Sequence, residues 1–162
     1  MHISGSAAGV VGFLLVTGCA QNPIPEGYRG PTARIVDTIE PQGEHSAYIF
    51  YVEEVDGRRI DNASAWATRA NSGNGLSLRL YSVEFGRNVP AAPAAFKVVG
   101  YIHYPAPIQT LFNRTGRVSG TINFTPEPDG DYIVTGKLND DHPAVWIEDA
   151  HSHKVAGEKV QQ

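Results

Sequence analysis

The chain has 162 residues, a hydrophobic fraction of 41% and a formal net charge of −4. This length and composition suit one domain of ordinary size with its own apolar core. The acidic balance and the lack of a basic cluster argue against phosphate-backbone contacts, so nucleic acid is not an expected partner. Cys19 is the only cysteine. An intramolecular disulfide is therefore excluded, and stability must come from packing.

The N-terminal stretch carries the sharpest signal in the sequence. Residues 1–18 contain no Lys, Arg, Asp or Glu, and Val10–Val16 is almost continuously apolar. This run is short of the roughly 20 residues that a helix needs to cross a bilayer. It matches the apolar region of an export signal, although the segment before it offers only His2 where such signals normally carry Lys or Arg.

The motif at the end of the run, Val16-Thr17-Gly18-Cys19, resembles the lipobox of bacterial lipoproteins. The resemblance implies that residues 1–18 are removed as a signal peptide. It also implies that a diacylglyceryl group is attached to the Cys19 thiol and that the new amino terminus is acylated by a chain such as palmitate. In Gram-negative lipoproteins, an Asp directly after the cysteine favours retention in the inner membrane. Here that position is Ala20, so the resemblance implies the outer membrane, facing the periplasm. The alternative is that Cys19 is an unmodified cysteine at the end of an ordinary signal peptide.

The segment after Cys19 is rich in proline and glycine. Residues 20–31 (AQNPIPEGYRGP) show little apolar periodicity, which indicates a locally stiff tether or an ordered arm on the domain surface. The chain thus divides into a signal peptide (1–18), a lipidated cysteine with its tether (19–32) and a single β-sandwich domain (33–162).

From Ala33 onward the apolar pattern has a period near two, which is typical of half-buried strands. Asp56-Gly57 predicts a tight hairpin, because both positions favour positive φ values. The strands expected from this pattern cover residues 33–39, 47–55, 58–60, 76–85 with a bulge near 81–82, 96–104, 118–124, 132–138, 145–147 and 154–160.

These strands predict an all-β fold, an antiparallel β-sandwich of about seven to nine strands. Residues 62–68 are ambiguous, 89–95 are expected to be a turn or crossover, and no stretch predicts an amphipathic helix. Trp146 is expected to be a core anchor. The rhythm of residues 51–57 and 116–122 resembles small immunoglobulin-like and transthyretin-like modules of exported bacterial proteins, a resemblance that carries no active site with it.

Histidines near the C-terminus form the best candidate metal cluster. His151 and His153 could share one face of a strand, with His142 on the preceding loop, and imidazole suits Zn²⁺ or Cu²⁺. Their place between two expected strands favours a solvated hairpin tip instead, so no metal or cofactor is expected. The acidic runs 129–131 and 139–141 lack the ligand spacing of a calcium loop and are interpreted as turns.

No motif for catalysis is present. The sequence has no Gly-x-Ser-x-Gly elbow, and adjacent His-Ser pairs do not imply catalytic geometry. Catalytic residues are therefore not expected. Tyr101, His103 and Tyr104 place aromatic surface near one strand end and form a candidate binding patch, although such residues are commonly core or cross-strand pairs.

Two functions follow as hypotheses. The first is a membrane-anchored envelope lipoprotein whose non-catalytic domain contacts an envelope protein as an adaptor, inhibitor or assembly factor. It would meet the bilayer only through acylated Cys19. The alternative is a metal- or small-ligand-binding periplasmic domain that uses the region of His142, His151 and His153.

Overall fold

The computed structural model describes residues 20–43, 45–71, 85–105, 116–139 and 141–162. Within these residues the chain is mostly β-structure, as predicted, with one short helix. The elements in chain order are β1 (Thr32–Pro41), β2 (Ala47–Val55), β3 (Arg58–Arg59), α1 (Ala63–Asn71), β4 (Phe85–Pro90), β5 (Ala94–His103), β6 (Arg117–Phe124), β7 (Asp131–Lys137), β8 (Ala144–Asp149) and β9 (Val155–Gln161).

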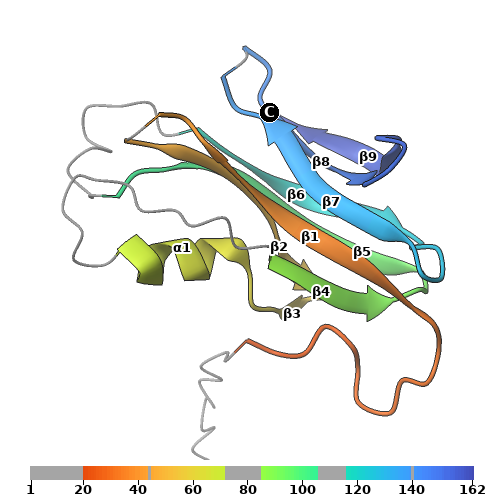
Figure 1. The fold of residues 1–162 in the computed structure, drawn as a ribbon. Coiled ribbons are helices and arrows are strands. Elements are labelled where there is room, and N and C mark those ends of the chain that lie inside the picture. The colour runs from red at the N-terminus through yellow and green to blue at the C-terminus, as the bar shows by residue number, and fades with distance from the viewer. Residues whose placement is uncertain (1–19, 44, 72–84, 106–115, 140) are drawn as a thin grey trace, which may run out of the picture.

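The strands form one continuous sheet that curves until it is nearly a barrel (Figure 1). Its order is β6-β5-β2-β1-β7-β8-β9, while β3 pairs with β2 and β4 pairs with β1. β1 changes partners along its length. Thr32–Asp37 pairs with β4, and Thr38–Pro41 pairs with β2. Asp37 therefore sits where β1 passes from one part of the sheet to the other.

The prediction of a purely antiparallel arrangement is wrong at one place. β1 and β7 run parallel, with Arg34 opposite Asp131 and Asp37 opposite Val134. Strand alternation predicts which side chains are buried, but it does not specify the direction of the neighbouring strand. Because β1 and β7 are far apart in sequence, no hairpin turn fixes their orientation.

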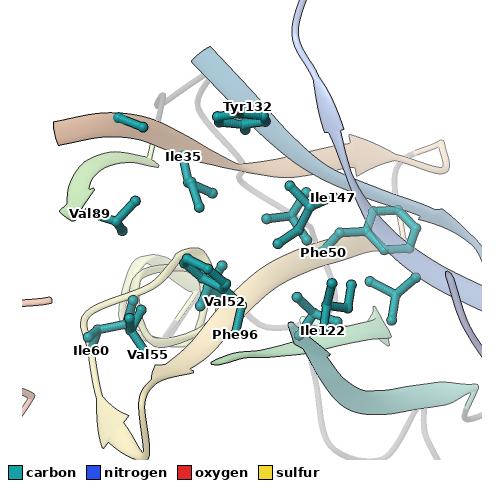
Figure 2. Close-up of a cluster of buried hydrophobic side chains, with 14 of the residues drawn as sticks. Ile35, Phe50, Val52, Val55, Ile60, Val89, Phe96, Ile122, Tyr132 and Ile147 are labelled. Atoms are coloured by element: carbon teal, nitrogen blue, oxygen red, sulfur yellow. The ribbon is translucent and has the colours of Figure 1, made fainter. Parts of the chain in front are cut away.

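The main core fills the inside of the curved sheet (Figure 2). Phe50 from β2, Phe96 from β5, Ile122 from β6 and Ile147 from β8 are all less than 2% exposed. The predicted alternation of β5, β6 and β7 is confirmed, since their inward positions belong to this cluster. These inward residues are Phe96, Val98, Val118, Ile122, Tyr132 and Val134.

The two ends of the strand order, β6 and β9, meet through side-chain packing. A Cβ on Gly120 would lie 2.7 Å from Cγ1 of Val160, and a Cβ on Gly157 would lie 2.7 Å from Cγ2 of Ile122. The absent side chains therefore let the two strands approach closely.

The predicted hairpin after β2 is confirmed. Asp56 and Gly57 have φ values of 49° and 74°, and β3 returns antiparallel to β2. The expected turn at 89–95 is shorter than predicted, because β4 continues through Pro90 and β5 begins at Ala94. Most of the strand expected at 76–85, including its bulge, lies outside the described residues.

The expectation of no helix is wrong, because α1 forms over most of the ambiguous stretch 62–68 and beyond it. The Asn62 side chain caps its first turn by accepting a hydrogen bond from the N–H of Ala65 at 3.1 Å. Ala63 and Ala67 are fully buried and pack with Trp66 against a second cluster on the outer face of β2 and β5. Alanines provide a weak apolar pattern, which explains why the helix was missed.

Trp146 is buried, with 8% of its surface exposed, but it is not part of the main core. Val145 and Ile147 point into that core, so alternation directs Trp146 to the other face of β8. There its Nε1–H donates to Glu148 at 2.8 Å, and the Lys159 ammonium lies 3.9 Å from the ring centroid. The residue is thus covered by polar and charged side chains.

Residues 20–31, here called the arm, begin beside β3 and reach the start of β1 through a loop (Figure 1), and the first of them are bonded to the domain. The N–H of Gln21 donates to the carbonyl of Arg59 at 2.8 Å, and Gln21 forms a parallel bridge with Ile60. Arg58 donates to the carbonyl of Pro23 at 3.1 Å. Of the two alternatives for this segment, the structure favours the ordered arm.

Candidate functional site

The candidate patch lies at the end of β5, and the structure brings only two of its three members together. Tyr101 and His103 lie on the same side of β5, with ring centroids 6.0 Å apart at nearly right angles. Tyr104 follows the strand and, by alternation, falls on the opposite side of it. Burial raises the pKa of Tyr104, and its neighbour Tyr48 raises that pKa further. The three side chains therefore do not form one surface.

A polar chain links Tyr101 to the helix. The hydroxyls of Tyr101 and Ser64 are 3.0 Å apart, and the Tyr101 hydroxyl is 3.4 Å from Nδ1 of His103. Tyr51 packs edge-on against Tyr101, with centroids 6.1 Å apart. Burial raises the pKa of Tyr101, so its hydroxyl remains protonated. The cluster is a hydrogen-bonded group between α1 and the sheet.

His103 is the most constrained member of this cluster. It is only 9% exposed, and its Nε2 has no hydrogen-bond partner among the described residues. Burial lowers the pKa of His103, because the charged imidazolium is poorly solvated there. A buried neutral histidine can act as a pH-sensitive element of stability.

This environment predicts acid sensitivity. The unfolded chain binds a proton at His103 near pH 6.5, whereas the folded chain does so only at lower pH. Stability from this residue is therefore present above about pH 6.5 and is lost as pH falls toward the folded pKa. We expect His103→Gln to reduce the fall in melting temperature between about pH 7.5 and 5.5. An unchanged pH dependence in that variant would show that another group is responsible.

A buried carboxylate that the sequence analysis missed lies where β1 changes partners. Asp37 is 4% exposed and accepts hydrogen bonds from the N–H groups of Val52, at 3.1 Å, and Ala63, at 2.9 Å. Arg87 from β4 forms an ion pair with the same carboxylate. Burial raises the pKa of Asp37, while Arg87 and the two N–H donors oppose that shift.

This group connects β1, β2, β4 and the first residue of α1. Ala63 begins the helix, so the Asp37 carboxylate also meets the positive end of the helix dipole. Arg87 Nη1 has no hydrogen-bond partner within the part of the chain that the structure describes. The signal in the sequence was a single acidic residue, Asp37, on the same strand parity as Ala33, Ile35 and Ile39. The arrangement joins elements, since the one carboxylate contacts groups from β2, β4 and α1.

The three histidines of the candidate metal cluster do not converge. His142 precedes β8, whereas His151 and His153 follow it in the turn to β9. The six residues of β8 separate these positions by about 20 Å along the strand. In the described parts of the chain, no group of three or more His, Cys, Asp or Glu side chains could hold a metal ion.

The β8–β9 turn has its own hydrogen-bond network. The Asp149 carboxylate accepts from the N–H of His151 at 3.1 Å and from both the N–H and the hydroxyl of Ser152, at 2.6 and 2.7 Å. The bonds from Ser152 hold the pKa of Asp149 below its usual value. His153 Nδ1 lies 2.9 Å from Glu148 Oε1. The histidines therefore lie in an exposed hairpin turn between β8 and β9, as expected, and hydrogen bonds order that turn.

We expect replacement of both His151 and His153 by alanine to change the free energy of unfolding by no more than about 0.5 kcal/mol. Both side chains are exposed, so the His153–Glu148 contact that is lost contributes little, and the Asp149 bonds to the turn use backbone groups and Ser152. Chemical denaturation with and without added Zn²⁺ measures this. A rise in stability with Zn²⁺ that disappears in the double variant would instead assign a metal site to the tip.

A cleft of about 360 Å³ opens beside this turn. Phe124 and Tyr132 provide an aromatic wall, and Glu127, Asp149 and Lys154 carry its charges. The Tyr132 hydroxyl accepts a hydrogen bond from the N–H of Glu127 at 2.9 Å, which fixes this wall. The cleft is large enough for a small ligand.

Cys19 lies outside the described residues. No helix in the described ranges is both long enough and apolar enough to cross a bilayer. Comparisons with protein-family models, with curated proteins and with solved structures gave no match to this chain.

Proposed function

We propose that the protein is an envelope lipoprotein anchored through acylated Cys19, most simply in the outer membrane facing the periplasm. The observation that carries the proposal is the motif Val16-Thr17-Gly18-Cys19 at the end of an apolar run of export-signal length. The docked arm is compatible with it, because Gln21, two residues after the cysteine, is bonded to the domain at Arg59 and Ile60.

The domain is proposed to act without catalysis, by contacting another envelope protein. In support, the polar cluster of Ser64, Tyr101 and His103 lies between α1 and the sheet, where its groups bond to one another. The all-β architecture is also compatible with the proposed likeness to small exported immunoglobulin-like or transthyretin-like modules.

The second candidate is a periplasmic small-ligand domain, which is favoured by the cleft at Phe124 and Tyr132.

Replacing Cys19 with serine tests the anchor. We expect the variant to accumulate as an unprocessed precursor or as soluble protein, because serine offers no thiol for the diacylglyceryl group. Wild-type protein should resist high salt and be released by detergent, since acyl chains and not charges would hold it. Fractionation with immunodetection measures both forms. Wild-type protein in the soluble periplasmic fraction would contradict the proposal.

In-cell crosslinking separates the two functional candidates. The first predicts that a protein of the envelope is crosslinked to the wild type. The second predicts that a small molecule copurifies with the domain and that Tyr132→Ala removes it. Separation of inner and outer membranes by density tests the Ala20 inference without affecting the other conclusions.

A further inference from the structure

We propose that the edge of the domain formed by β3 and the arm lies at the headgroup level of the bilayer. This inference rests on the proposed lipidation of Cys19 and adds an orientation to it. The sequence alone allowed either a tether of about a dozen residues, which would not fix how the domain is oriented, or an ordered arm on the domain surface. The structure assigns those residues to the domain surface.

The arm is fixed at its first described residues. Gln21 bridges Ile60 and donates its N–H to the Arg59 carbonyl, and Arg58 holds the carbonyl of Pro23. Ile60 is 3% exposed and belongs to the main core, so the attachment is to a rigid part of the fold. The point where the chain leaves the domain is therefore Gln21, beside β3.

Covalent geometry then limits the distance to the anchor. Two residues of extended chain span at most about 7 Å, so the Cα of Cys19 lies within that distance of the Cα of Gln21. A free tether of twelve residues would reach about 40 Å. If Cys19 carries acyl chains, β3 cannot lie far from the membrane surface. β9, on the opposite side of the molecule in Figure 1, must then face away from it.

Charge does not explain this orientation. The side chains around the arm and the β2–β3 turn include three basic and three acidic residues: Arg29, Arg58, Arg59, Glu26, Asp56 and Asp61. This balance gives no net attraction to anionic lipids. The contact should therefore be insensitive to salt, because the chain and not the Coulomb energy places it there.

The test uses single engineered cysteines in the full-length, membrane-processed protein. Since Cys19 is the only native cysteine and its thiol would be acylated, a new cysteine is the only free thiol. Arg59→Cys places a fluorophore at β3, and Glu158→Cys places the matched control on β9; both positions are exposed. The labelled proteins are reconstituted in phosphatidylethanolamine–phosphatidylglycerol vesicles that contain a headgroup spin-labelled lipid quencher.

We expect the probe at position 59 to be quenched several-fold more strongly than the probe at position 158, at low and high salt alike. Gln21→Pro in the Arg59→Cys background should reduce the quenching toward the control value, because proline cannot donate the bond to the Arg59 carbonyl. Gln21→Ala keeps that N–H and should leave the quenching unchanged.

The outcomes separate the two proposals. Failure of the protein to float with vesicles would remove the anchor, and the orientation with it. Flotation with equal quenching at positions 59 and 158 would overturn the orientation alone. Unchanged quenching in Gln21→Pro would likewise overturn the role of the docked arm.

Discussion

Replacing Asp37 with alanine is expected to lower the free energy of unfolding by about 3–5 kcal/mol. The substitution removes the partner of the mostly buried Arg87 and leaves that cation without compensation. It also leaves the N–H groups of Val52 and Ala63 without their acceptor. Chemical denaturation at neutral pH measures the loss. The helix should be affected most, because Ala63 is its first residue.

The matched control is the ion pair between Arg34 and Asp131, which joins the same strand to β7. Its side chains are 40% and 34% exposed, so Asp131→Ala should cost only about 0–1 kcal/mol. The double variant Asp37→Ala/Arg87→Ala should lose less stability than the sum of the single variants, since no unpaired charge remains. Equal losses for Asp37→Ala and Asp131→Ala would show that the buried pair does not join the elements as described.

Phe50→Ala is the second substitution with a large expected effect, about 3–5 kcal/mol. Phe50 is fully buried in the main core, beside Ile147 (Figure 2). Its ring fits a slot between two strands, because Gly100 on β5 and Gly136 on β7 both lack a side chain there. Removing the ring would leave a cavity between β2 and these neighbours. Thermal and chemical denaturation both measure the loss.

A second variant tests the slot itself. A Cβ on Gly100 would lie 2.8 Å from Cδ1 of Phe50, so Gly100→Ala should destabilise the wild type by about 1–3 kcal/mol. In the Phe50→Ala background the same change meets no ring and should cost little. Additive losses in the double variant would contradict the proposed packing of the ring against Gly100.

Much of the β-structure could be predicted from the sequence, because burial on one face imposes an alternating pattern. The inward residues of β6, such as Val118 and Ile122, follow that pattern and enter the core. The Asp56-Gly57 hairpin was predictable for a local reason, since both residues adopt positive φ. These features depend on neighbours in sequence or on a repeated period.

Features that depend on distant parts of the chain could not be predicted in this way. The parallel pairing of β1 with β7 joins segments about a hundred residues apart. The helix is stabilised by the packing of Ala63 and Ala67 against β2 and β5, and a sequence pattern of alanines does not reveal that packing. Asp37 was not singled out from the sequence, because its partners come from three other elements, β2, β4 and α1.

The candidate site was predicted only in part, for the same reason. Alternation explains why Tyr101 and His103 lie together and why Tyr104 does not join them. The contact between the Tyr101 and Ser64 hydroxyls requires α1, which was not expected. The arm composition allowed both a tether and an ordered segment, and the bond from Gln21 to Arg59 decides between them.

Mass spectrometry of the N-terminal peptide from the membrane-extracted wild-type protein tests the central claim most directly. The account predicts a peptide that begins at Cys19, with a diacylglyceryl group on its thiol and an acylated amino terminus. A peptide that extends before Cys19, or one that carries a free Cys19 thiol, would contradict it.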